Sequence, residues 1–522
     1  HPSGFDMTIA GGPLDFYTVT DHAEYLGILP VMNTPGTELS KLPRAQDMFS
    51  TDPEKITAAF QSVGASVRSG EVIEEMYDES IIGSVWEQNI DAANRHYVPG
   101  EFTTFAAYEF TSVTVNEEED SFAGGNLHRN VFFKGDAPDR AFSTLDSPNP
   151  EDLWDWMDEQ RSEGYDPLDV AYAEQRMRNE PLVEVTQVKG TSETHPSLSP
   201  NDEWANFEIY DRLLASYQVS KTEGGYVREA YRNGLKLQEE EGFDPFRFGL
   251  VAASDSHVVG GAYDESDYWS KVGVVDGTPM ARGSVPFFGK KNWDEQPDDQ
   301  MVNNAREWFS RWAASGLTGV WAEENTRESI FDAFRRKETF ATTGPRMKVR
   351  FFAGYRYSDD MLDDADLTRQ AYDGGVPMGG DLVGTGEAPT FLAWAQRDPN
   401  MGALQRVQVV KVTSVGEAVY DVACHTGSPD PATHRCSDNG AAGDMETCAP
   451  TGAGANELKA VWQDPDFDVA QRATYYVRVL ENPSCRWSTW EAMRGNVPPR
   501  PDVPQTIQER AYTSPIWYIP AD

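Results

Sequence analysis

The chain is poor in basic residues and contains no long apolar run. Its 522 residues include 44 lysines and arginines against 85 aspartates and glutamates, which gives a formal net charge of −41. A strongly acidic protein repels nucleic acids and anionic lipids, because both are negatively charged. We therefore expect neither to be the main partner. No stretch approaches the ~18 apolar residues that a membrane-spanning helix requires, and no integral membrane segment is predicted.

The sequence also lacks the motifs of several common catalytic sites. It has no G-x-S-x-G turn, no G-x-x-x-x-G-K-[ST] loop and no H-E-x-x-H helix. Nothing therefore indicates an activated serine or a nucleotide-binding loop. A metal-bound hydroxide is the simpler nucleophile for a hydrolytic reaction.

Cysteine is scarce and confined to one region. The four cysteines all lie beyond residue 420, at Cys424, Cys436, Cys448 and Cys485. Zinc sites usually have paired spacings such as C-x₂-C, and these are absent. We therefore predict two disulfides between loops, with all three possible pairings left open. Disulfides are typical of a periplasmic or secreted protein.

Two regions of the chain differ in their hydrophobic pattern. Up to residue 345, β-rich runs alternate with helical patterns, which predicts an α/β fold with a mainly parallel sheet, open or closed into a barrel. The predicted strands are 14–20, 102–110, 127–133, 182–188 and 246–253, and the helices are 53–64, 72–95, 150–163 and 225–241. Beyond residue 345, short β-type runs between loops rich in Gly, Pro and Asp predict a β-sandwich. These runs are 347–354, 390–395, 407–412 and 474–480.

Histidines and carboxylates stand beside several of the predicted strands. The chain has only eight histidines, and three of them follow this pattern. In barrel enzymes the functional groups lie where strands emerge from a rigid frame. Imidazoles mixed with carboxylates suit manganese, zinc or iron, and a carboxylate can bridge two ions. The predicted metal ligands are His22, Glu109, His128, Asp255 and His257.

Three further side chains are candidates for the chemistry itself. Lys189 could bind an anionic group of a substrate, and His195 could act as an acid or complete the site. An equally good alternative is that their run is a strand-to-loop turn held by hydrogen bonds. Arg129 follows a predicted ligand, and it either clamps phosphate or pairs with an acidic neighbour.

Several long runs resemble one protein family. They are DFYTVTDHAEYLG (15–27), GGNLHRNVFF (124–133), EVTQVKGTSETHP (184–196), GVWAEENTRESIFDAFRRKETFATTGPR (319–346), CRWSTWEAMR (485–494) and TIQERAYTSPIWYIP (506–520). These runs resemble the DUF3604 family over nearly the whole chain. That family is similar to the PHP (polymerase and histidinol phosphatase) superfamily, whose members are distorted seven-stranded (β/α) barrels with two or three metal ions. The resemblance implies a PHP-like distorted (β/α)7 barrel over residues 1–345, followed by a β-rich, sandwich-like domain over 346–522.

The resemblance also implies roles for single residues. In the Thr20-Asp21-His22 run, His22 is the expected ligand and Asp21 the partner that orients it. Glu109 is expected to bridge two ions, and His128 to ligate from the next strand. Both end residues of the Asp255-Ser256-His257 motif are expected ligands.

Two parts of the superfamily pattern are missing. The initial H-x-H strand is absent, because the chain starts after that point. The P-H-N segment is also absent, as though an internal piece were missing between Leu168 and Asp169. If both segments are truly lacking, the site has fewer ligands than the superfamily pattern expects.

The expected function is that of a metal-dependent hydrolase, most simply a phosphoesterase acting on a small anionic ester. Two or three divalent ions (Mn, Zn or Fe) are the expected cofactors. One alternative keeps the metals but changes the bond, to carboxylic ester or amide hydrolysis or to lyase chemistry. The other is a non-catalytic binding or scaffold protein with a decayed site.

Overall fold

The structure is a computed structural model with several stretches left undescribed. It describes residues 11–112, 127–159, 170–213, 219–258, 263–273, 276–286, 292–293, 309–313 and 315–521. The predicted missing piece beside Leu168 and the last part of the predicted helix 150–163 lie outside these ranges. Within them, no helix is both long and apolar enough to cross a membrane.

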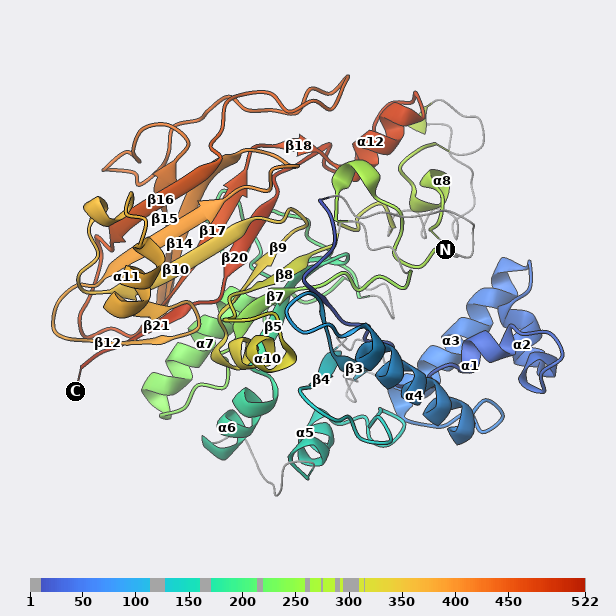
Figure 1. The fold of residues 1–522 in the computed structure, drawn as a ribbon. Coiled ribbons are helices and arrows are strands. Elements are labelled where there is room, and N and C mark those ends of the chain that lie inside the picture. The colour runs from blue at the N-terminus through green and yellow to red at the C-terminus, as the bar shows by residue number, and fades with distance from the viewer. Residues whose placement is uncertain are drawn as a thin grey trace.

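The N-terminal region combines short strands with longer helices (Figure 1). Its strands are β1 (Phe16–Tyr17), β2 (Thr103–Thr104), β3 (Ala106–Phe110), β4 (Arg129–Phe133), β5 (Leu182–Gln187), β6 (Gly190–Thr191), β7 (Gly249–Ala252), β8 (Leu317–Val320) and β9 (Thr339–Thr342). Its helices are α1 (Ile28–Met32), α2 (Pro43–Met48), α3 (Pro53–Ser69), α4 (Glu79–His96), α5 (Pro150–Glu159), α6 (Val170–Asn179), α7 (Val227–Glu240), α8 (Pro279–Arg282) and α10 (Arg327–Arg336).

These strands pair in both directions. β1–β2 and β5–β7 are parallel, whereas β3–β4, β5–β6 and β8–β9 are antiparallel. The described pairs are thus mixed in direction, and the mainly parallel sheet stays a prediction. A short turn accounts for the antiparallel direction only of β5 and β6, whereas β8 and β9 are antiparallel although α10 lies between them in the chain. The closed barrel stays a prediction.

The C-terminal region is dominated by two sheets. The smaller has the strand order β11-β10-β13-β16, and the larger has the order β12-β21-β17-β20-β9-β8, with β14 between β15 and β17. The strands are β10 (Lys348–Gly354), β11 (Gly375–Pro377), β12 (Asp381–Val383), β13 (Thr390–Gln396), β14 (Leu404–Thr413), β15 (Gly416–Cys424), β16 (Glu457–Gln463), β17 (Ala473–Glu481), β18 (Ser484–Cys485), β19 (Thr506–Ile507), β20 (Arg510–Thr513) and β21 (Ile516–Ile519). Two helices accompany them, α11 (Leu367–Gly374) and α12 (Trp487–Arg494).

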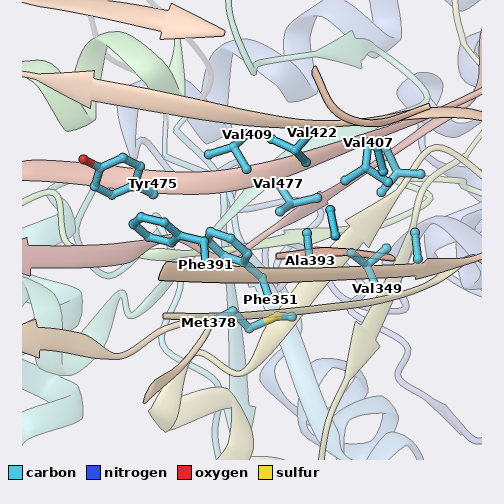
Figure 2. Close-up of a cluster of buried hydrophobic side chains, with 14 of the residues drawn as sticks. Val349, Phe351, Met378, Phe391, Ala393, Val407, Val409, Val422, Tyr475 and Val477 are labelled. Carbon is cyan, nitrogen blue, oxygen red and sulfur yellow. The ribbon is translucent and has the colours of Figure 1, made fainter. Parts of the chain in front are cut away.

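The two sheets pack face to face around an aromatic and aliphatic core. Figure 2 shows Phe351 and Phe391 from the smaller sheet beneath Val409 and Val477 from the larger one. The rings of Phe351 and Phe391 stack with their centroids 5.7 Å apart. Two sheets that pack face to face around one core form a β-sandwich arrangement.

The larger sheet is buried on its second face as well. Along β14, Val407 and Val409 enter the sandwich core, whereas Val410 and Val412 pack against β5, β7 and α7. Because successive side chains point to opposite faces, these valines show that β14 is covered on both sides, and its polar residues Gln408 and Lys411 are buried as well. β9 from the N-terminal region pairs with β20, so the sheet continues across the predicted domain boundary at residue 345. That boundary stays a prediction.

Both predicted disulfides are confirmed, and the structure selects one of the three pairings. Cys424 bonds to Cys436, and Cys448 bonds to Cys485. Both bonds fasten the long loop between β15 and β16, the first to the end of β15 and the second to β18. The two bonds are consistent with an extracellular or periplasmic protein.

A buried network of charges joins α7 to the larger sheet. The guanidinium of Arg478, on β17, contacts Asp202 at 2.8 Å and Glu193 at 3.1 Å. Arg228, on α7, contacts the same two carboxylates at 3.0 and 2.6 Å. Tyr476 donates a hydrogen bond to Glu193 at 2.7 Å. Both carboxylates precede α7 in the N-terminal region, whereas Arg478 lies in the sandwich. The network therefore connects the two regions.

We expect Asp244→Asn to stabilise the protein at neutral pH. Burial raises the pKa of the Asp244 carboxyl to about 6, although its Oδ1 accepts a hydrogen bond from the amide of Phe246. As the pH rises from about 4 to 6, the unfolded chain ionises before the folded one, so stability falls. The variant should be more stable by about 3 kcal/mol at pH 7 and equally stable near pH 4. Urea unfolding at both pH values checks this, and an equal stability at pH 7 would contradict it.

Candidate metal centre

Three predicted ligands meet at the ends of neighbouring strands. Within the described part of the chain, one group of His, Cys, Asp or Glu side chains has the geometry to hold a metal ion, namely His22, Glu109 and His128. One ligand atom from each lies within 4.8 Å of the others. Two imidazoles and a carboxylate suit manganese, zinc or iron, so this donor set fits the expected kind of ion.

Backbone pairing sets the positions of these side chains. His22 follows β1 and forms a parallel bridge with Glu109 on β3. The amide of Glu109 donates to the carbonyl of Asp21, and the amide of Ala23 donates to the carbonyl of Glu109, both at 2.9 Å. His128 directly precedes β4, the antiparallel partner of β3. Residues far apart in sequence are therefore brought together by strand register alone.

Neighbouring groups orient the two histidine rings. His22 Nδ1 lies 2.6 Å from the hydroxyl of Thr111 and 3.6 Å from Glu109 Oε2. His128 Nδ1 contacts the other oxygen of Glu109. Behind this layer, the buried Glu24 accepts hydrogen bonds from the amides of Thr111 and Thr144. Such outer contacts hold metal-binding imidazoles in one orientation.

The other two predicted ligands lie beside this group. The His257 ring is 5.6 Å from the His22 ring between centroids, the same separation as between His22 and His128. Asp255 has a left-handed backbone conformation, with φ of 47°. Its carboxylate contacts the ammonium groups of Lys189 and Lys271, the latter at 2.9 Å. The site thus brings all five predicted ligands together, and Lys189 with them.

The charges in the site shift several pKa values. Burial opposes ionisation of Glu109, but the hydrogen bond from His128 and the nearby imidazoles outweigh it, so the pKa is lowered. The pKa of Asp255 lies well below its usual range, because the two lysines outweigh its burial. Burial and the Lys271 ammonium lower the pKa of His257 to about 4. At neutral pH the site therefore offers ionised carboxylates and an uncharged His257.

The remaining predicted residues have different surroundings. Asp21 lies next to His22, and burial raises its carboxyl pKa. Arg129 pairs with Glu180 at 2.5 Å, which was one of its two predicted roles. Adjacent strand residues point to opposite faces, so Arg129 points away from the face of His128. His195 contacts Ser197 at 2.7 Å and the ring of Tyr226, with no described contact to the predicted ligands.

Sequence reasoning missed two ionisable residues of the site, Glu184 and Lys271. Glu184 lies on β5, and burial together with the charge of Asp255 raises its carboxyl pKa to about 8. It opens the run 184–196 and could have been singled out as an acidic residue inside an apolar strand. Lys271 lies in an irregular segment without a periodic pattern. No local signal in the sequence points to it.

Comparison with known proteins identifies a family. The family described as "Protein of unknown function (DUF3604)" matches residues 1–168 and, separately, 162–520. The predicted DUF3604 membership is confirmed. The two matched segments meet where the sequence indicated a missing internal piece, beside Leu168. No curated protein and no solved structure matches the chain.

Proposed function

This chain belongs to the DUF3604 family, and we propose that it is a metal-dependent hydrolase of ester bonds, most simply a phosphoesterase. The observation that carries the proposal is the group formed by His22, Glu109 and His128, with Asp255 and His257 beside it. Side chains from four separate segments do not converge in this way for packing alone, since their polar atoms face one another. The resemblance to PHP barrels, itself a prediction, suggests phosphorus as the reacting centre.

The ligand group would hold a divalent ion through two imidazole nitrogens and one carboxylate. When bound, such an ion polarises an ester oxygen and makes hydroxide available at neutral pH. The chain's own residues keep the donors in place: Thr111 holds the His22 ring and Glu24 holds the amide of Thr111. These contacts fix the orientation of the donors, which limits the reorganisation that ion binding requires.

The chain also supplies positive charge where an anionic ester would be expected. Although the whole chain has a net charge of −41, the ammonium groups of Lys189 and Lys271 both lie against Asp255 at this site. The two ammonium groups outnumber the one carboxylate that they contact, and positive charge around Asp255 favours anionic over neutral ligands. This observation supports a small anionic ester as the substrate class.

The direct test combines metal content with hydrolysis. We expect protein purified without chelator to contain manganese, zinc or iron by inductively coupled plasma mass spectrometry, and to hydrolyse an aryl phosphate. The double variant His22→Ala/His128→Ala should lose both properties, because two of the three ligands are removed. His96→Ala is the matched control, since His96 is an exposed residue in the last turn of α4.

Two results would count against the proposal in different ways. If the protein binds no ion after incubation with manganese, zinc and iron in turn, the hydrolase proposal is wrong. A non-catalytic binding or scaffold role then remains. If the protein hydrolyses carboxylic esters in a metal-dependent way but no phosphate monoester or diester, the metal site is supported and the phosphoesterase assignment is wrong. A panel with all three ester classes separates these outcomes.

A further inference from the structure

Two lysines occupy the half of the site formed by Asp255 and His257. Lys271 Nζ lies 2.9 Å from Asp255 Oδ1, 2.7 Å from the Asp255 carbonyl oxygen and 3.1 Å from His257 Nδ1. Lys189 Nζ contacts the second carboxylate oxygen, Oδ2. Both oxygens of this predicted metal ligand therefore already have a cationic partner.

The lysines are held there by the surrounding fold. The side chains of Lys271 and Asp255 are only 6% and 12% exposed. The fully buried Asp276 accepts hydrogen bonds from the amides of Lys271 and Gly273, at 2.6 and 2.7 Å. The carbonyl of Lys271 accepts the amide of His257 at 2.7 Å, which ties the two segments together. Asp276 and His257 therefore both fix the backbone of Lys271, which holds its ammonium group at the site.

Charge balance then distinguishes the two halves of the site. The Asp255 half pairs one carboxylate with two ammonium groups, whereas Glu109 is contacted by His22 and His128 and by neither lysine. A second divalent ion on Asp255 and His257 would have to share their ligand atoms with the Lys271 ammonium. Like charges at such distances repel strongly in a buried site.

We propose that Lys189 and Lys271 are built-in cations that take the place of further metal ions at Asp255 and His257, so that this chain holds a single divalent ion on His22, Glu109 and His128. The inference rests on the proposed function, because it assumes that the three-ligand group binds an ion. The inference lowers the expected number of bound divalent ions from two or three to one. Asp255 then serves to position the two ammonium groups.

The test is the number of Mn²⁺ ions bound per 522-residue chain. Chelator-treated protein is titrated with Mn²⁺ by isothermal titration calorimetry, and bound metal is measured after free ion is removed. We expect about one equivalent for the unaltered chain and about two for Lys189→Met/Lys271→Met, in which the second position is vacated. Lys41→Met/Lys236→Met is the matched control, because both lysines are exposed, and it should stay at one.

A measurement on the unaltered protein guards against misfolding of the variant. One isolated Mn²⁺ gives a hyperfine-split paramagnetic resonance spectrum, whereas two ions sharing a ligand give an exchange-coupled one.

The outcomes separate this inference from the proposed function. A coupled spectrum, or two or more equivalents in the unaltered chain, overturns the single-ion inference and leaves the hydrolase proposal standing. A folded lysine double variant that still binds one equivalent also overturns it. No Mn²⁺ bound at all, with zinc and iron also failing, overturns both.

Discussion

Asp202→Asn is expected to lower the free energy of unfolding by about 3–5 kcal/mol. Asp202 is 1% exposed in its side chain and contacts Arg228 and Arg478, which are equally buried. Asparagine keeps the shape but removes the charge that compensates two guanidinium groups. Removing one member of a buried charge network is costly, because the remaining charges cannot be solvated.

The next residue provides a matched control. Glu203 is 49% exposed and pairs with Arg435 at 3.1 Å on the surface. Glu203→Gln makes the same chemical change one position along the chain, and it should cost no more than about 1 kcal/mol. Urea denaturation of both variants at pH 7 gives the comparison, and similar losses would contradict the importance of burial.

The pH dependence gives a second check on the same network. The two arginines hold the pKa of Asp202 below its usual range, despite its burial. A carboxyl with a lowered pKa in the folded state contributes stability above the unfolded value of about 4, and this contribution is lost as the pH falls. The difference between the unaltered chain and Asp202→Asn should therefore shrink below about pH 4. A constant difference would mean that packing, not charge, causes the loss.

Removing the disulfide between Cys448 and Cys485 is expected to cost about 4 kcal/mol. The bond joins cysteines 37 residues apart, whereas Cys424 and Cys436 are 12 residues apart. A longer closed loop restricts the unfolded chain more, so the shorter one should contribute about 3 kcal/mol. The paired serine variants Cys448→Ser/Cys485→Ser and Cys424→Ser/Cys436→Ser are compared with the unaltered chain by urea unfolding without reductant.

The order of these two losses is the informative result. A larger loss for the 12-residue bond would contradict the loop-length argument and indicate that native contacts around Cys436 dominate. Cys436 has such contacts, since its amide donates to the buried Asp421 at 2.7 Å. Reductant should destabilise the unaltered chain by about the sum of both losses and leave the variant that lacks all four cysteines unchanged.

Local elements could be predicted well, whereas their pairing could not. The helices α3, α4 and α7 and the strands β13, β14 and β17 fall where the hydrophobic periodicity predicts them. β14 and β17 carry apolar residues on both faces, interrupted by buried polar ones such as Gln408 and Arg478, and this pattern identifies strands but not their neighbours. The pairing of β9 with β20 joins residues about 170 positions apart in chain order, Ala341 to Tyr512, and nothing local encodes it.

The same distinction holds at the candidate site. Its five predicted ligands were accessible to sequence reasoning because each stands beside a strand. The alternation of strand side chains also explains why His128 and Arg129, though adjacent, have separate partners. Lys271 was not accessible, since Asp276 fixes its segment through backbone hydrogen bonds that no pattern predicts.

The position of β20 in the larger sheet has a consequence for how the protein is made. β20 is the strand that connects β17 to β9, and it is synthesised after both of them (Figure 1). Until residues 510–513 leave the ribosome, β9 and one side of β17 remain open edges, which readily pair with other chains. The nascent chain must therefore stay protected from its neighbours from the synthesis of β9 until β20 emerges. Export of an unfolded chain, with folding and oxidation afterwards, would meet that requirement.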